Sequence, residues 1–492
     1  MPLILFKYKH PSFILSVLVA LGILSVLIYK ASITSFTHDE AFTYTHYVHQ
    51  GFFDIISFKH PYLNNHILNS LLMKYSEMLF GKSELALRLP SILGFVIYSV
   101  FGLLWLFKIC PRLILPCYIL LVLNPYLLDF FILARGYGLS FGFLMASVYF
   151  ISLYLETYSS KPLIYHHIAV LLAIFSNFSM LNYFVVSFVV LNLILLTNFY
   201  FVKKQFTRQQ LISFYKVSAV CFIGYVVFLF EPIRRLTGIT LLDFGGKEGF
   251  MMDTVRSIIY DVFYEQAVSN ELLLILKSLS VVVFITGLII SGYMLFKKTV
   301  FLITQHVVLF YSSFLLFGMV SVSVLQHYII GNDYYLHRFA IFYYVVFMIN
   351  LCALLAYLHQ RVASFVSVAL SALGAILLLI NVSVNLPLHY FKDWKYDMST
   401  KQVMQVLQQK QQEQPNKKIQ LGVNWLFEPS TNFYRIIWDL KWLAPTHRNG
   451  ISNTDDYLYL FLTDKEWQNY QHLPKVLENK VSNTVLVQQQ SF

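Results

Sequence analysis

The chain has 492 residues, of which 57% are hydrophobic, 17% are aromatic and only 12% are charged. A soluble domain carries about 25% charged residues, so this composition excludes an ordinary soluble protein and indicates an integral membrane protein. The net charge of +11 is spread over short loops, which argues against the basic stripe typical of a nucleic-acid-binding protein.

Hydropathy over windows of about 19 residues predicts about eleven membrane-spanning helices. The first, 12–30, follows Lys7 and Lys9 without a small-residue cleavage site, so we expect a retained signal anchor. The others are predicted at 89–107, 113–132, 137–155, 163–180, 183–201, 211–230, 271–296, 299–325, 339–358 and 363–385. Asn124-Pro125 and Gly136 interrupt the third and fourth spans, so we expect their inner ends to be short or broken.

Positive charges in the loops predict the orientation of these spans. If the N-terminus is cytoplasmic, each cytoplasmic turn carries at least one basic residue: Lys108, Arg112, Lys161, Lys203, Lys204, Arg208, Lys297, Lys298 and Arg361. The 231–270 loop, the 326–338 loop and the C-terminal tail then lie outside, with a first outer loop over residues 31–88. Cations also occur on that side, at Lys59, Arg88, Arg135, Arg234, Arg235, Arg256 and Arg338. An anionic ligand at the outer leaflet would account for them, and snorkelling at helix ends is the plainer alternative.

Adjacent carboxylates, Asp39 and Glu40, stand out in the first outer loop because ionisable groups near a bilayer are costly to desolvate. The alternative to a functional site is a solvated loop in which the two acids cap the following helix. Apolar residues at three- and four-residue steps predict an amphipathic helix over 65–80, which Gly81 ends and which a short turn capped by Ser83 follows. The aromatic segment 41–58 predicts a second amphipathic helix, and both are expected on the outer membrane surface.

The composition turns polar after Pro387, which predicts a small α/β domain outside the membrane over residues 387–492, following a transmembrane domain over 1–386. We expect a helix from about Thr400 to Gln412 and another from about Thr431 to Leu440. Strands are predicted at 419–427, 457–462 and 481–487. No catalytic motif stands out in this region.

The outer loops supply the residues that can carry chemistry: His38, Asp39, Glu40, His60, His66, Arg135, His327, Asp333, His337 and Arg338. Neighbours on a helix point in different directions, so one of the two acids can face a site while the other caps or tethers. A metal site formed by His38, Asp39, His60 and His66 is an alternative, although hydrogen-bonding or solvated histidines are favoured because loop spacing is weak evidence for a metal. The cysteines, at positions 110, 117, 221 and 352, lie in or beside spans without metal-ligand spacing, so neither disulfides nor zinc are expected.

The order of these motifs resembles the GT-C membrane glycosyltransferases. The resemblance lies in the first span, the Asp-Glu pair, His60-Pro61, the stretch Phe80-Gly81-Lys82-Ser83-Glu84-Leu85-Ala86-Leu87-Arg88-Leu89-Pro90, and Ala134-Arg135-Gly136-Tyr137-Gly138-Leu139. A looser match follows at 335–339. Within the superfamily, the chain is similar to the bacterial branch of protein O-mannosyltransferases and the lipid A aminoarabinose transferase. The single proline after His60, where the family often has two, departs from the pattern.

The resemblance implies an inverting transfer of a sugar from a polyprenyl-phosphate donor to a lipid, glycan or protein acceptor. Asp39 corresponds to the family's catalytic acid residue and would act as general base, with Glu40 as a supporting acid. Arg135 and Arg338 are the candidates for binding the donor phosphate, and His60, His66 and Tyr137 for positioning substrate. No dissociable cofactor is implied; some GT-C enzymes use a divalent metal, which this sequence does not indicate.

Two other classes of function compete with this interpretation. A transporter or flippase for a lipid or solute usually shows internal repeats and ionisable groups near the bilayer midplane, and neither is found here. An inactive scaffold whose outer tail binds a partner is disfavoured by the intact Asp39 and Arg135, by analogy alone. The positive-inside layout suits a bacterial inner membrane, with a cytoplasmic N-terminus and a periplasmic C-terminal domain, and an organelle membrane is the alternative.

Overall fold

The computed structural model describes residues 11–60, 64–202, 206–236, 245–300, 304–413, 418–451 and 457–489. Several residues used in the sequence analysis lie outside these ranges: Lys7, Lys9, Pro61, Lys203, Lys204, part of the 231–270 loop and part of the ninth predicted span. The chain forms two compact units that alternate along the sequence. The helical unit contains residues 1–26, 91–131 and 136–386, and the α/β unit contains residues 27–90, 132–135 and 387–492.

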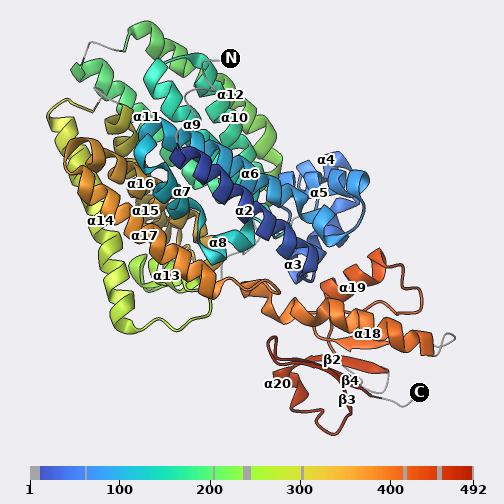
Figure 1. The fold of residues 1–492 in the computed structure, drawn as a ribbon. Coiled ribbons are helices and arrows are strands. Elements are labelled where there is room, and N and C mark those ends of the chain that lie inside the picture. The colour runs from blue at the N-terminus through green and yellow to red at the C-terminus, as the bar shows by residue number, and fades with distance from the viewer. Residues whose placement is uncertain are drawn as a thin grey trace. The chain divides into compact units, whose positions relative to one another are not determined.

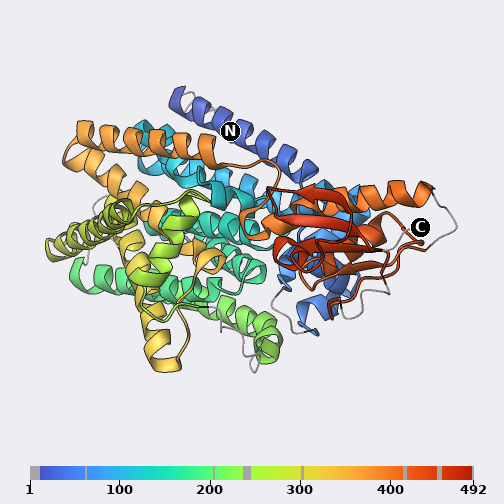
Figure 2. The same cartoon turned by 90° about the horizontal axis from the view of Figure 1, so that it is seen from below.

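Long apolar helices form the helical unit and confirm the prediction of a polytopic α-helical membrane protein (Figures 1 and 2). Nine helices in the described ranges are long and apolar enough to cross a membrane. They are α2 (Pro11–Ile33), α6 (Glu84–Ile109), α9 (Tyr137–Thr157), α11 with η3 (Met180–Tyr200 in its apolar part), α12 (Arg208–Leu236), α14 (Asn270–Phe296), α15 (Thr304–Ile330), α16 (Ile341–Arg361) and α17 (Ser364–Asn385). The third and fifth predicted spans correspond to shorter apolar helices, Pro111–Val122 (η2 and α7) and Ser160–Ser176 (α10).

The third span is broken where the sequence predicted a break. Helix α7 (Ile114–Val122) ends, and α8 (Pro125–Phe130) begins with a proline at its first position. The Asn124 side chain caps α8 by accepting hydrogen bonds from the backbone N–H groups of Tyr126 and Leu127, at 2.9 and 3.2 Å. An Asn-Pro pair inside an apolar run therefore ends one helix and starts the next.

Glycine allows a close helix crossing directly after the Arg135 motif. A Cβ atom on Gly138, in the first turn of α9, would lie 2.6 Å from the carbonyl oxygen of Phe130. A Cβ on Gly94 of α6 would lie 2.4 Å from the backbone of Gly138. These distances leave no room for a side chain, so the backbones of α6 and α9 are in contact.

The first outer loop departs in part from its predicted structure. Helix α5 (Ile67–Phe80) confirms the predicted helix over 65–80, and Gly81 ends it with a φ of +83°. The predicted helix over 41–58 is wrong as a single element, because this segment ends α3 (His38–Thr43) and continues as the π-helical η1 (Tyr44–Val48) and α4 (Phe52–Ile56). The turn predicted after Ser83 is instead the start of α6, in which Ser83 caps the N–H of Ala86 at 3.2 Å.

A four-stranded sheet forms the C-terminal part of the α/β unit, in the order β1-β2-β4-β3. The strands are β1 (Leu421–Val423), β2 (Tyr459–Thr463), β3 (Lys475–Asn479) and β4 (Thr484–Gln488); β1 and β2 are parallel and the other pairs antiparallel. Its helices are η6 (Lys392–Ser399), α18 (Thr400–Glu413), α19 (Glu428–Ile437) and α20 (Asp464–Trp467). Three strands and both longer helices confirm the predicted elements, while the edge strand β3 was not predicted.

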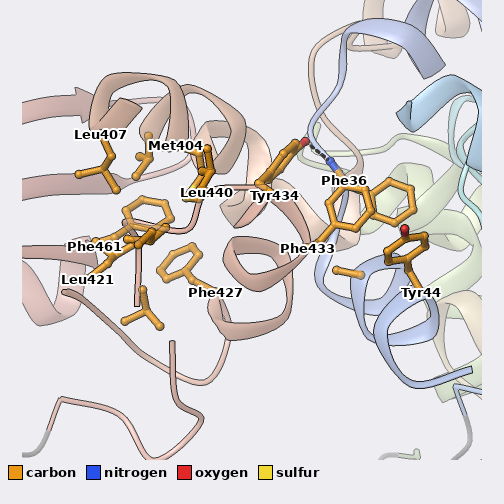
Figure 3. Packing of buried hydrophobic residues seen from close by; sticks show 14 of the residues in the cluster. Phe36, Tyr44, Met404, Leu407, Leu421, Phe427, Phe433, Tyr434, Leu440 and Phe461 are labelled. Carbon is orange, nitrogen blue, oxygen red and sulfur yellow. Dashed lines mark hydrogen bonds between the residues drawn. The ribbon is translucent and has the colours of Figure 1, made fainter. Parts of the chain in front are cut away.

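One hydrophobic core joins the first outer loop to the C-terminal region (Figure 3). Phe36 and Tyr44 of the loop are fully buried with residues of α18, α19 and the sheet, among them Met404, Phe433 and Phe461. The rings of Phe36 and Phe433 stack with centroids 4.1 Å apart. Burying such a side chain contributes about 1.5–3 kcal/mol, so these contacts are a substantial part of the unit's stability. The predicted domain boundary at residue 386 itself stays a prediction.

Candidate active site

Helix α3 carries the two adjacent carboxylates in its first turn. Thr37 precedes the helix with extended backbone angles, and its N–H and hydroxyl donate to Oε2 of Glu40 at 2.9 and 3.0 Å. This is a capping box, in which the third helical residue reaches back to the start of the helix. The spacing Thr-x-x-Glu therefore fixes where α3 begins and which way Glu40 points.

Glu40 is tied into a fully buried ion pair. Its side chain and that of Arg88 are both 0% exposed, and the guanidinium donates from Nε and Nη2 to the two carboxylate oxygens at 2.9 and 2.7 Å. The backbone N–H of Ala134 donates to Oε1 at 2.6 Å. Pairing two buried charges in bidentate geometry offsets their desolvation, whereas either charge alone would be strongly unfavourable.

Arg88 is a structural residue and neither a snorkelling cation nor a ligand for an external anion. Its Nη1 donates to the backbone carbonyls of Ala31 and Thr34 and to the Thr34 hydroxyl, at 2.8–3.0 Å. Its Nη2 also donates to the carbonyl of Ser35 at 2.8 Å. The alternatives considered for Arg88 from sequence are therefore wrong, because its donors are directed at groups of the chain itself.

Asp39 points away from Glu40 and toward Arg135. Its Oδ2 lies 3.5 Å from Nη2 of Arg135, and its Oδ1 lies 3.4 Å from the side-chain amide of Asn64. The Asp39 side chain is 12% exposed and that of Arg135 is 4% exposed. The divergence expected for neighbouring acids is thus observed: the Glu40 carboxylate is fully buried against Arg88, and the Asp39 carboxylate, which is largely buried, faces Arg135.

The segment that carries Arg135 is held from both sides. The N–H of Ala134 donates to Glu40, and the carbonyl of Ala134 accepts a hydrogen bond from the side chain of Asn69 at 2.8 Å. Asn69 lies on α5 and is fully buried. Since both peptide groups of Ala134 are fixed, the backbone that leads into Arg135 is held in place.

The histidines of the first outer loop occupy different environments. The Nδ1 of His38 lies 2.8 Å from the carbonyl oxygen of Leu426, so that nitrogen carries the proton, and burial lowers the pKa of the ring. His66 is buried and directly precedes α5, while His60 is exposed and its carbonyl accepts a 3.4 Å hydrogen bond from Tyr47. Within the described ranges, no three or more His, Cys, Asp or Glu side chains gather in a way that could hold a metal ion.

Tyr137 and Arg338 belong to the helical unit. Tyr137 opens α9 and is buried, with its ring centroid 4.8 Å from that of Phe130. Arg338 lies in η5 (His337–Phe339), and its guanidinium is 5.1 Å from the centroid of Phe339. His337, which precedes it, has a φ of +49° and is held by the Asp261 carboxylate at 3.1 Å. This strained turn fixes the backbone beside Arg338.

Sequence reasoning missed the residues of the C-terminal region that contact α3. Asp397 and Tyr434 bind the backbone N–H groups of His38 and Phe36, at 2.6 and 2.8 Å, across about 360 and 400 positions of sequence. No local pattern marks either residue, because their role depends on the tertiary fold alone. Arg88 belongs to a motif that the sequence analysis recognised. Its ion pair with Glu40, however, could not be predicted from the sequence.

Comparison with solved structures finds two crystal structures of ArnT from Cupriavidus metallidurans. The structure bound to undecaprenyl phosphate is 12% identical, with a TM-score of 0.47, over 97% of this chain and 98% of that one. The structure in the apo state is 13% identical, with a TM-score of 0.45, over 97% of each chain. No family model and no curated protein matches the sequence.

Proposed function

We propose that this protein is an integral membrane glycosyltransferase that moves a sugar from a polyprenyl-phosphate donor to an acceptor hydroxyl. The observation that carries the proposal is that the two adjacent acids lie in different environments. Glu40 is fully buried and paired with Arg88, whereas Asp39, whose side chain keeps 12% exposure, faces the Arg135 guanidinium. A carboxylate that is not tied into the Arg88 pair and lies beside a cation is suited to act as a base next to a phosphate leaving group.

In the proposed reaction, Asp39 accepts the proton of the acceptor hydroxyl as the oxygen attacks the anomeric carbon. The new carbon–oxygen bond forms on the face opposite the departing phosphate, so the anomeric configuration inverts. The bond between the anomeric carbon and the phosphate oxygen breaks, and its electron pair leaves with the polyprenyl phosphate. The step therefore balances in protons, bonds and charge without a redox partner. General-base assistance of this kind typically raises the reaction rate by about 10²–10⁴-fold.

In this proposal, Arg135 interacts with both the Asp39 carboxylate and the donor phosphate. Its Nη2 lies 3.5 Å from Oδ2 of Asp39, and in the proposed reaction part of its guanidinium would bind the donor phosphate. Arg338 is proposed as a second phosphate ligand, and Tyr137, His60 and His66 as residues that position substrate. Glu40 supports the site by fixing α3 and the backbone N–H of Ala134.

The proposed setting is a bacterial inner membrane with the reaction at its periplasmic face. The N-terminus would be cytoplasmic and the C-terminal region periplasmic, as the distribution of Lys and Arg predicts. The partners would be the lipid-linked sugar donor and a lipid, glycan or protein acceptor. The proposed chemistry uses side chains of the chain and requires no dissociable cofactor.

The test is a transfer assay with purified protein in lipid and a panel of polyprenyl-phosphate sugars. Wild type should release polyprenyl phosphate with at least one sugar, and Asp39→Asn should not, while keeping its elution profile and melting behaviour. Asp54→Asn is the matched control, because it makes the same substitution in the same loop at a side chain that is 40% exposed and paired with Lys59. Absence of turnover with every donor, together with saturable movement of a lipid or solute across vesicles, would replace this proposal with a transporter.

A further inference from the structure

The backbone just before Asp39 is held by a carboxylate from the C-terminal region. Asp397, in η6, is 1% exposed, and its Oδ2 accepts a hydrogen bond from the backbone N–H of His38 at 2.6 Å. Its Oδ1 accepts hydrogen bonds from the hydroxyls of Ser430 and Thr400, at 2.7 and 3.2 Å. Asp397 is therefore fixed by two hydroxyls and in turn fixes the peptide that joins Thr37 to His38.

Two further contacts hold the residues on either side of that peptide. The Tyr434 hydroxyl accepts a hydrogen bond from the N–H of Phe36 at 2.8 Å, as Figure 3 shows, and donates to Glu84 at 3.1 Å. The carbonyl of Leu426 accepts a hydrogen bond from the His38 ring at 2.8 Å. Three contacts from α19, its preceding loop and η6 thus fix residues 36–38, immediately before the proposed base.

A short helix depends on such contacts for its direction. Helix α3 has six residues and continues into the five-residue π-helical η1, and isolated helices of this combined length are marginal in water. Its first N–H groups have no partner within the helix. The Glu40–Arg88 pair fixes one side of α3, and Asp397 fixes the N–H of its first residue, His38. Together they determine where the Asp39 side chain points.

We propose that Asp397 is a positioning residue, which holds the His38 backbone so that Asp39 faces Arg135. The C-terminal region then helps to orient helix α3, which carries the proposed base, in addition to any contact that it makes with substrate. This inference rests on the proposed function for its catalytic consequence, whereas the positioning itself is a property of the protein without substrate.

Hydrogen exchange of the full-length protein in lipid tests the positioning directly. Asp397→Ala should raise the deuterium uptake rate of peptides spanning residues 36–44 by at least tenfold, because the His38 N–H loses its acceptor. Asp397→Asn should restore slow exchange, since its carbonyl oxygen can accept the same hydrogen bond. Val487→Ala is the control, because Val487 is fully buried in a separate cluster with Leu460, Leu462, Trp467 and Val485. It should leave uptake at 36–44 unchanged.

Kinetics on the same variants test the consequence for catalysis. With the sugar donor that wild type uses, Asp397→Ala should lower kcat by roughly tenfold to a hundredfold, as a displacement of about 1 Å does at other active sites. KM for donor and acceptor should stay within about twofold, and Asp397→Asn should regain most of the lost kcat. An effect on KM alone would overturn the assignment in favour of substrate binding by Asp397.

The two experiments separate the failure of this inference from the failure of the proposed function. Wild-type exchange at 36–44 in Asp397→Ala would overturn the inference, whatever the transfer assay shows. Faster exchange in a protein that transfers no sugar would leave the positioning intact and refute the proposed function. If Asp397→Ala is not recovered folded, Ser430→Ala removes one hydroxyl that orients the carboxylate and should raise uptake in the same direction by a smaller factor; unchanged uptake there would overturn the inference.

Discussion

Glu40→Gln is predicted to destabilise the α/β unit far more than its small chemical change suggests. The carboxylate accepts five hydrogen bonds, from Nε and Nη2 of Arg88, the N–H and hydroxyl of Thr37 and the N–H of Ala134. Every partner is a donor, whereas one end of a glutamine side chain is also a donor. The substitution therefore places an NH₂ group against N–H groups and leaves a buried guanidinium without its counter-charge.

The expected cost follows from this geometry. Removing one partner of a fully buried ion pair costs about 3–5 kcal/mol, and each kcal/mol shifts the midpoint of a domain of this size by about 2–4 °C. We expect the midpoint of the α/β unit to fall by roughly 6–20 °C. Intrinsic fluorescence is a suitable probe, because five of the six tryptophans lie in this unit: Trp394, Trp425, Trp438, Trp442 and Trp467.

A matched control and a double variant make the prediction refutable. Asp439→Asn removes a carboxylate from a pair with Lys441 in which both side chains are more than three-quarters exposed, and it should change stability by less than about 0.5 kcal/mol. Combining Glu40→Gln with Arg88→Met should cost less than the sum of the single changes, by roughly 0.5–3 kcal/mol. Additive costs, or a Glu40→Gln midpoint equal to that of Asp439→Asn, would refute a buried, mutually dependent pair.

Three further outcomes are expected. Arg135→Ala should weaken donor binding more than acceptor binding, and Arg135→Lys should recover part of the affinity; a change confined to the acceptor KM would remove Arg135 from the phosphate site. Burial raises the pKa of Asp397 to about 7, so the folded α/β unit binds a proton that the unfolded chain releases, and its stability should fall as pH rises between about 4 and 7. Asp397→Asn should remove that part of the slope, and an unchanged midpoint–pH curve would contradict the assignment. Gly138→Ala should destabilise the helical unit by about 1–3 kcal/mol, seen as earlier thermal labelling of the buried Cys117 and Cys352; wild-type labelling would show that the α6–α9 contact can open.

The membrane helices could be predicted from local sequence features, whereas the candidate site could be predicted only in part. Apolar runs of sufficient length and the Asn124-Pro125 break were readable because span length and helix capping depend on neighbouring residues. The divergence of Asp39 and Glu40 was likewise readable from their adjacency. Which acid would form the fully buried ion pair was not predictable, because the answer depends on Arg88, 48 positions away.

In the C-terminal region, too, the local elements could be predicted from the sequence but the long-range contacts could not. Its helix α18 and strands β1, β2 and β4 follow from composition and periodicity, but the edge strand β3 alternates too weakly to be recognised. Asp397 is an ordinary aspartate in the sequence, and its bond to His38 spans 359 positions. The compact α/β unit combines residues 27–90 with residues 387–492, and this pairing of distant segments depends on tertiary contacts that no local pattern predicts.

The central claim is that Asp39 acts in the chemical step and not in holding substrate. The most direct measurement compares donor binding with single-turnover transfer in wild type and Asp39→Asn, using a donor that wild type accepts. The account predicts donor affinity within a few-fold of wild type and a transfer rate lower by at least 10²-fold, the smaller end of typical general-base contributions. Transfer at the wild-type rate, or a loss explained entirely by weaker donor binding, would contradict it.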